Sequence, residues 1–412
     1  MPTSAGSPPD RQPSPANPLW GPDWLAVRAH WPLDPALAHL NHGGFGAVPL
    51  PVLEHQDRLR QAMERNPNAF FRDVEDQLDQ ARLRVAAFLG SDPDGVVFVP
   101  NATTGISTVL ASVPLSPEDE LLVTSQTYPA IQVAAEHACR RSGARLVVAD
   151  VPLPADPSAR PAEPILAAVT DRTRLAIVDH VASRTGVRFP IEELVAGLRQ
   201  RGVRSLVDAA HAPGLFDVRL EALAADYWVG NFHKWCCSPR GAAALYVAPE
   251  HRERLAPLVT SVGAPAGYPS SFGWLGTDDY TPYLCVPAAI AFLESLGWDR
   301  LRGHNRALAR MAEAVVRDAL GGEVAVDTGF AESMALVALP PGLGATPEAA
   351  GRLWSLVAEQ LRAEVAVVAV GGRGYLRLSA QAYNAPAEYE RLAAALPAFL
   401  ARQAGEASSA AS

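Results

Sequence analysis

The sequence almost lacks lysine. Lys234 is the only lysine among 412 residues, and every other strong cation is an arginine. Arginine stays protonated and cannot attack a carbonyl carbon, whereas a desolvated lysine amine can, typically by forming a Schiff base. A chance survivor on a surface helix is the competing explanation. The surroundings favour a chemical role, because Lys234 follows the strand-like apolar run 227–230, and α/β proteins place ligand sites at strand ends.

Cysteine is scarce as well. Cys139, Cys236, Cys237 and Cys285 are the four cysteines, and no C-x-x-C pair occurs, so neither a zinc site nor a disulfide framework is indicated. The adjacent pair Cys236 and Cys237 is compatible with redox chemistry, but packing against the core is the favoured role. Reduced thiols predict a cytoplasmic location.

Long apolar runs and basic blocks are also missing. No run approaches the roughly 20 apolar residues of a membrane-spanning helix. The net charge of −9 argues against nucleic acid as a partner, since no basic block exists to neutralise phosphates. Residues 1–20 and 404–412 are predicted to be disordered tails, and the Pro- and Ser-rich first tail lacks the apolar centre of a secretory signal.

The chain does contain a regular alternation of short β-rich runs and helical segments. The predicted strands are 96–99, 120–124, 145–149, 174–179, 204–208, 226–230 and 243–247. Most are separated by enough chain for a crossover helix, which predicts a largely parallel sheet covered on both faces. The last two runs are so close that one of them is expected to be antiparallel. We therefore predict an α/β fold with a seven-stranded, mainly parallel sheet in a large domain over residues 21–265.

The pattern changes after a Gly/Pro-rich break at 263–267. One long helical stretch is predicted over 283–318, and the elements expected after it are strands at 334–338, 365–370 and 375–379 and a helix near 387–402. Residues 266–403 are thus expected to form a smaller α+β domain. Before the sheet, two helices are predicted near 51–65 and 73–90.

Polar segments follow several predicted strands. Residues 100–105 open a helix, where free N–H groups suit a phosphate, although a threonine cap without a ligand explains the segment equally well. Residues 125–130 offer the ring of Tyr128. Asp208 closes one strand, and residues 231–234 follow the next. Pyridoxal phosphate (PLP) needs this combination: a lysine for its aldehyde, an anion cradle, a stacking ring and a carboxylate at its ring nitrogen.

The motifs that carry these residues resemble the class V aminotransferase superfamily of fold-type I PLP enzymes, in particular its isopenicillin N epimerase-like branch. The matching motifs span nearly the whole chain from about residue 38: LNHGGFG (40–46), NATTG (101–105), SRTG (183–186), DAAHAPG (208–214), NFHKW (231–235), WLGTDDY (274–280) and RLSAQAYN (377–384). The Asp-x-Ala-His and His-Lys motifs are the specific ones, and the Gly-rich start is supporting.

The resemblance implies catalytic roles for three residues. Lys234 would form the internal aldimine with PLP and then move the α-proton of the substrate. Tyr128 would stack on the cofactor ring, where relatives often have histidine. His211 would reach the ring hydroxyl or the substrate.

It also implies the other cofactor contacts. Asp208 would pair with the pyridinium nitrogen, and Ser183 stands near the ring hydroxyl, where many relatives have asparagine. The residues expected at the phosphate are Thr103, Thr104, Asn231 and His233, with Asn231 replacing the serine or threonine of many relatives. Thr277 matches a residue that crosses to the phosphate of a partner subunit, which implies a homodimer.

For the substrate, the resemblance assigns the α-carboxylate to Arg377 through a bidentate pair. Without the resemblance, an arginine inside a β-run is equally compatible with a structural ion pair. Asn41, His42 and Gly44 would complete the carboxylate pocket. Arg72 is considered as a contact to the substrate side chain, with a solvated surface arginine as the favoured interpretation.

The motifs do not select the reaction, because that choice lies in the geometry of the pocket. Loss of the α-proton can lead to epimerisation, to expulsion of a β-substituent such as the sulfur of a cysteine conjugate, or to transamination. The resemblance places an epimerase ahead of a β-eliminating C–S lyase and an aminotransferase. A two-base epimerisation needs a proton donor opposite Lys234, for which Tyr128 is the candidate.

Other classes are disfavoured. Cysteine desulfurases use a cysteine in the C-terminal part of the chain, and no cysteine follows Cys285. A binding protein that had lost catalysis would be expected to lack Lys234 or Arg377, and both are present. A dinucleotide site would need a GxGxxG after the first strand, which does not occur.

Overall fold

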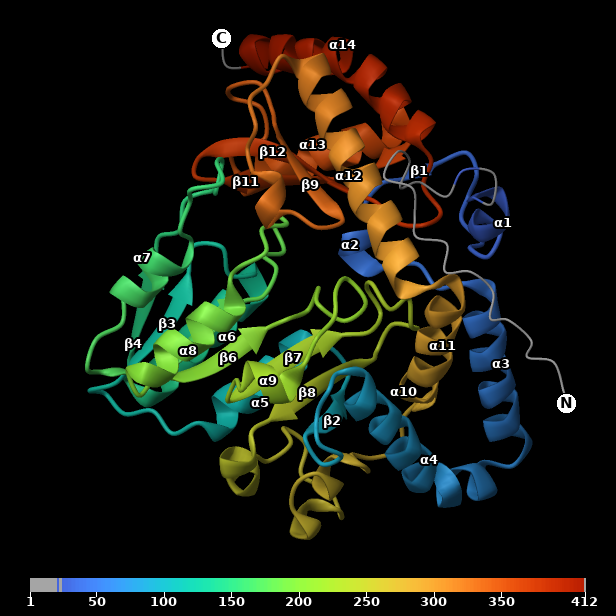
Figure 1. Ribbon diagram of the computed structural model, residues 1–412, viewed down its shortest axis with the longest axis vertical. Helices are drawn as coiled ribbons and strands as arrows, with labels where there is room; N and C mark the ends of the chain where they lie inside the picture. The colour runs from blue at the N-terminus through green and yellow to red at the C-terminus, as the bar shows by residue number, and fades with distance from the viewer. Residues whose placement is uncertain (1–20, 22–23, 411–412) are drawn as a thin grey trace, which may run out of the picture.

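The computed structural model describes Gly21 and residues 24–410, which form a larger α/β part and a smaller α+β part (Figure 1). The predicted N-terminal tail, residues 1–20, lies outside the described residues. The larger part is built on a seven-stranded sheet with the strand order β2-β8-β7-β6-β5-β3-β4. Its strands are β2 (Val96–Val99), β3 (Glu120–Thr124), β4 (Arg145–Ala149), β5 (Thr173–Asp179), β6 (Arg204–Asp208), β7 (Tyr227–Asn231) and β8 (Ala243–Val247).

The predicted fold class is confirmed, including the antiparallel strand among the last two. β8 pairs antiparallel with both β2 and β7. The other neighbouring strands, from β7 across to β4, are all parallel. Because parallel strands place their carboxyl ends at one edge, the loops that follow β3, β5, β6 and β7 meet there.

Both faces of this sheet are covered by helices, which explains why its strands are continuous apolar runs. In β7, Trp228 packs into a core with α4 (Pro67–Phe88) and α8 (Ile191–Gln200). Its neighbours in the strand, Tyr227 and Val229, face the opposite core, with α5 (Ala102–Ser112) and α6 (Pro129–Ser142). The remaining helices of the larger part are α1 (Trp24–Arg28), α2 (His42–Phe45), α3 (Leu50–Arg65), α7 (Ala162–Ala167) and α9 (Leu220–Leu223).

The smaller part has a three-stranded antiparallel sheet, in the order β11-β12-β9, under three helices. Its elements are β9 (Met334–Ala338), β11 (Ala366–Val370), β12 (Arg373–Ser379), α12 (Trp298–Leu320), α13 (Pro347–Leu361) and α14 (Pro386–Ala410). The N-terminal segment reaches this part, because β1 (Ala38–His39) pairs in parallel with β10 (Ala363–Glu364). The domain boundaries at 265 and 403 stay predictions.

The predicted single helix over 283–318 is wrong. The chain forms α10 (Thr281–Leu284), α11 (Val286–Leu296) and α12 in succession, and α12 runs from α11 into the smaller part (Figure 1). Pro287 has no N–H to continue a helical ladder, and Gly297 adopts a φ of 82°, which ends α11. At the C-terminus, the residues expected to be a tail from 404 are helical as far as Ala410, in an alanine-rich segment that favours helix.

None of the described helices is long and apolar enough to cross a membrane.

Candidate active site

Lys234 lies on the loop after β7, with its amine against an imidazole. Nζ is 3.0 Å from Nε2 of His211. The Lys234 carbonyl accepts from the N–H of Cys237 at 3.0 Å and lies 3.1 Å from Nε2 of His42. Burial, and then the charge of Arg377, lowers the pKa of Lys234 to about 7, against an opposing effect of Asp208. A large fraction of the amine is therefore uncharged at neutral pH and able to attack a carbonyl.

Arg377, in the middle of β12, brings a buried positive charge to the same site. It is only 5% exposed; Nη2 donates to Oδ1 of Asn41 at 2.8 Å, and Nη1 donates to the carbonyl of Ser183. Nε has no partner among the described residues, and Arg377 forms no ion pair with a described carboxylate. Burial lowers the pKa of Arg377 to about 10. A buried guanidinium bonded only to neutral oxygens is a costly arrangement that an incoming carboxylate would relieve.

The glycine-rich segment of residues 40–46 contacts the lysine loop itself. Gly46 has a φ of 70°, and a Cβ there would lie 1.9 Å from the carbonyl oxygen of His233, so no other residue fits. His42 is fully enclosed, with Nδ1 2.9 Å from the hydroxyl of Tyr383 and Nε2 against the Lys234 carbonyl. Gly44 adjoins Asn41, whose amide nitrogen would be 3.1 Å from a Cβ at Gly44. Asn41 thus reaches Arg377, whereas the contacts of His42 position Lys234.

The N-terminus of α5 forms one side of the site. Asn231 accepts from the N–H of Ala102 at 2.8 Å, and Asn101 accepts from the N–H of Thr104 at 2.9 Å and from its hydroxyl. The hydroxyl of Thr103 has no hydrogen bond to a described residue. Asn231 therefore caps the helix through its carbonyl oxygen, which leaves the positive helix end and Thr103 to face an anion.

Asp208 ends β6 beside Lys234. It is 5% exposed, and its Oδ1 accepts from the N–H of Ala210 at 3.0 Å. Burial raises the pKa of Asp208, while the Ala210 bond and the charge of Lys234 oppose that effect. Asp179, the last residue of β5, is the register partner of Asp208, and burial followed by the Asp208 charge raises the pKa of Asp179 well above its usual value.

The other predicted residues are distributed as follows. Tyr128 caps α6 with its ring 42% exposed, and its charge acts on Arg377, so the two lie in one region. His233 has a buried Nδ1 without a partner among the described residues, and burial lowers its pKa to about 4. Thr277 is exposed and borders, with Thr104, a cavity of about 690 Å³. Arg72 is exposed on α4, as the favoured interpretation of the sequence expects.

Two residues at this site were missed by sequence reasoning. Asp179 carried a signal, since it ends a predicted strand beside the one that Asp208 ends. Trp235, buried next to Lys234, donates from Nε1 to Nδ1 of His211 at 3.2 Å. Nothing in the sequence distinguishes that indole from a core residue.

The site's donor set fits PLP. Several buried polar atoms lack partners among the described residues, including Nδ1 of His233 and Nε of Arg377. The end of α5 suits the phosphate, and Asp208 supplies a carboxylate with an oxygen to spare for a protonated ring nitrogen. The single lysine, with its lowered pKa, suits the aldehyde.

The thiols do not belong to this site. All four cysteines are unpaired and buried, with Cys236, Cys237 and Cys285 at 0% exposure. Burial raises the pKa of each thiol, so none is disposed to form a thiolate. The structure thus offers no thiol nucleophile among its described residues.

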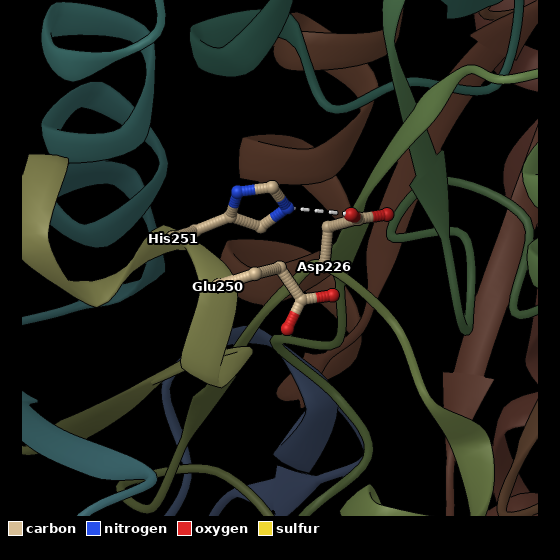
Figure 2. Close-up of side chains that lie close together, drawn as sticks. All are labelled: Asp226, Glu250 and His251. Atoms are coloured by element: carbon tan, nitrogen blue, oxygen red, sulfur yellow. Dashed lines mark hydrogen bonds and ion pairs between the residues drawn. The ribbon is translucent and has the colours of Figure 1, made fainter.

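A second group of titratable side chains, Asp226, Glu250 and His251, lies elsewhere (Figure 2). Nε2 of His251 is 2.7 Å from Oδ1 of Asp226, and Ser205 donates to the other oxygen from both its N–H and its hydroxyl. Arg204 and the neighbouring Arg254 line the same small cavity as Glu250 and His251. Because the acidic charge is already bonded and neutralised, we interpret this group as a structural ion pair.

Comparison with known proteins agrees with these features. A profile of the family Aminotransferase class-V matches residues 49–335. Isopenicillin N epimerase of Streptomyces clavuligerus is 34% identical over 397 residues, covering 92% of this chain and 98% of that protein. Putative L-cysteine desulfhydrase 2 of Oryza sativa subsp. japonica is 30% identical over 410 residues, covering 89% of this chain and 85% of that protein.

Solved structures share the fold at lower identity. A cysteine desulfurase from Thermococcus onnurineus NA1 superimposes with a TM-score of 0.76 at 19% identity, covering 91% of this chain and 97% of that one. C-DES with glycine covalently linked to its PLP cofactor gives a TM-score of 0.77 at 22% identity, covering 90% and 98%.

Proposed function

Because the chain belongs to the class-V aminotransferase family, we propose that it is an epimerase that inverts the α-carbon of an amino acid or amino-acid conjugate. That it is a PLP-dependent enzyme follows from the family and from its epimerase and C–S lyase relatives. The observation that carries the proposal is the buried guanidinium of Arg377, which lacks a carboxylate partner among the described residues and shares the site with Lys234. Such a site suits a substrate with an α-carboxylate and an α-amine.

When bound, PLP supplies an aldehyde for the amino group and a ring that withdraws electrons from the α-carbon. Lys234, Asp208 and His211 would hold the ring end, and Thr103, Thr104 and His233 would hold the phosphate together with the end of α5, which Asn231 caps. Ser183 lies beside the ring through the carbonyl that Arg377 contacts. Arg377 and Asn41 would orient the substrate carboxylate, which fixes the direction in which the α-proton points.

The chain's own groups then move the proton. With its pKa lowered to about 7, Lys234 can take a proton from the α-carbon at Nζ or return one there. Inversion requires a donor on the opposite face, and the hydroxyl of Tyr128 is our candidate. Its exposed ring lies in the same region as Arg377, which holds the carboxylate of the same α-carbon.

The epimerase proposal is supported by relatives of that name that match the chain over nearly their full length. The direct test incubates the purified enzyme with single enantiomers of amino acids and of amino-acid conjugates in deuterium oxide. We expect deuterium at the α-carbon and both stereoisomers, starting from either enantiomer, with no loss of ammonia. Release of ammonia with a 2-oxo acid would overturn the proposal.

A β-eliminating C–S lyase is the second candidate, since cysteine desulfhydrases are also among the relatives. Its signature in the same assay is pyruvate with ammonia and a thiol or sulfide. Transamination would instead give a 2-oxo acid whose amino group stays on the cofactor. Both outcomes retain the roles of Lys234 and Arg377 and change only the fate of the proton.

We further propose a homodimer in which Thr277 reaches the phosphate of the partner subunit. Thr277 is exposed on a segment that also exposes Leu258, Val259 and Val262, which suits a surface that a second copy covers. A cytoplasmic location, in keeping with four unpaired thiols, is part of the same proposal.

A further inference from the structure

His211 is held between an indole and an amine. Nδ1 accepts a hydrogen bond from Nε1 of Trp235 at 3.2 Å, and Nε2 lies 3.0 Å from Nζ of Lys234. Trp235 and His211 are each only 1% exposed. Both partners of the imidazole are therefore protein groups that follow one another in the chain.

The chemistry of the indole determines where His211 carries its hydrogen. An indole N–H can only donate, so Nδ1 must present a lone pair. Burial, and then the charge of Lys234, lowers the pKa of His211 well below its usual value, so the ring is neutral at neutral pH. A neutral imidazole has one N–H, which is then on Nε2 and points at the amine of Lys234.

We propose that Trp235 is a positioning residue: its indole N–H holds His211 in the Nε2–H form, which presents a hydrogen-bond donor to Lys234 and to any acceptor bound beside it. An uncharged lysine amine accepts that hydrogen bond, whereas a lysine ammonium, which only donates, cannot. The device thus favours the uncharged, nucleophilic form of the chain's single lysine. It rests on the proposed use of Lys234 but on none of the three reactions in particular.

The indole is seated by close contacts from three segments. Its ring lies 5.0 Å from that of His42 at an interplanar angle of 55°. A Cβ at Gly43 would lie 3.4 Å from Cζ2 of Trp235, and a Cβ at Gly214 would lie 2.6 Å from the Trp235 carbonyl oxygen. Larger residues at these glycines would therefore crowd the indole or displace the backbone beneath it, which accounts for glycine at both positions.

Other charges also act on Lys234, so the test must leave them in place. The groups that face it are Asp208 from the end of β6, Arg377 from β12, His42 from α2, and His211 and His233 from the adjoining loops. Trp235→Phe keeps all five and removes only the N–H donor. Trp228→Phe is the matched control, because Trp228 is also fully buried but its Nε1 has no partner among the described residues.

The first experiment reads the tautomer of His211 in the full-length apoprotein. Nitrogen-15 NMR of histidine-labelled protein, with His211→Gln to assign the signal, separates a bonded N–H from a bare ring nitrogen. We expect the Nε2–H form alone in the wild type and in Trp228→Phe, and a mixture with the Nδ1–H form in Trp235→Phe. An Nδ1–H form in the wild type, or an unchanged signal in Trp235→Phe, would overturn the proposal.

The second experiment measures the pH dependence of acetylation at Lys234, quantified by mass spectrometry of its peptide. In the wild type we expect a midpoint near the lowered pKa of about 7. In Trp235→Phe the released Nδ1 lets His211 accept from an ammonium, so the midpoint should rise by about one pH unit, the effect of one buried hydrogen bond. Trp228→Phe should keep the wild-type midpoint, and an equal midpoint in Trp235→Phe would contradict the account. Neither readout depends on turnover, so a failed epimerase assay would leave this result standing.

Discussion

Nη2 of Arg377 donates to Oδ1 of Asn41 across 2.8 Å and so connects the C-terminal sheet to the N-terminal segment at the active site. The amide orients the guanidinium without neutralising it. The pocket for the carboxylate is therefore assembled from two ends of the chain, 336 residues apart.

Replacing Arg377 by alanine should remove most of the binding of the substrate carboxylate. Losing one partner of a buried charge pair costs about 2–5 kcal/mol, so kcat/KM should fall by at least about 30-fold. Lysine at this position should restore little, because it cannot form a bidentate pair. Arg72→Ala, at an exposed site on α4, is the control and should behave as wild type.

Asp208→Asn should weaken the enzyme through its cofactor. The neutral amide cannot stabilise a protonated ring nitrogen, and kcat should fall by about 10²-fold or more, the lower end of what a positioned acid or base contributes. Asp179→Asn should cost much less, because burial and the adjacent Asp208 charge already favour the neutral form of Asp179. Equal losses in the two variants, measured by steady-state kinetics with saturating PLP, would contradict the assignment.

Much of this arrangement could be predicted because it is local in the sequence. The strands are apolar runs, and a polar residue at the end of a buried strand, such as Asp208 or the loop of Lys234, has to lie at the sheet edge. The contacts of His42 with the Lys234 carbonyl and of Trp235 with His211 depend on how distant loops fold over one another. The long helix over 283–318 was wrong for a local reason, since the residues around Pro287 and Gly297 are helical in composition but not in backbone.

The shared site can be tested by subunit complementation. If Thr277 reaches the partner's phosphate, a mixed dimer of Lys234→Ala and Thr277→Ala protomers contains one site with both native residues. Activity after mixing under exchange conditions should then exceed the sum of the two separate variants. A sum without a gain, in a mixture that native mass spectrometry shows to contain the heterodimer, would place Thr277 outside the partner's site.

The ion pair of Asp226 and His251 makes a prediction about stability and pH. Burial alone would raise the pKa of Asp226, but the bonds from His251 and Ser205 outweigh it and hold that pKa below its usual value. The stabilisation is therefore present above the unfolded-state pKa of about 4 and is lost as the pH falls through the lower folded-state value.

Asp226→Asn should accordingly lower the free energy of unfolding at pH 7 by about 1–3 kcal/mol, the range for hydrogen bonds to a charged group. The difference from wild type should shrink as the pH falls below about 4. Asp318→Asn, whose pair with Arg317 is 72% exposed on the acidic side, should change stability by less than about 1 kcal/mol. Denaturant titration at several pH values measures all three proteins, and a pH-independent loss in Asp226→Asn would refute the ionic explanation.

The central claim is that the single lysine binds PLP covalently. The most direct measurement is the visible absorption spectrum of the purified protein before and after borohydride, followed by mass spectrometry of the reduced chain. We predict a visible band that borohydride removes, a pyridoxyl group on the peptide of Lys234, and neither feature in Lys234→Ala. A protein that stays colourless with added PLP, or one that carries the label at another amine, would contradict the account.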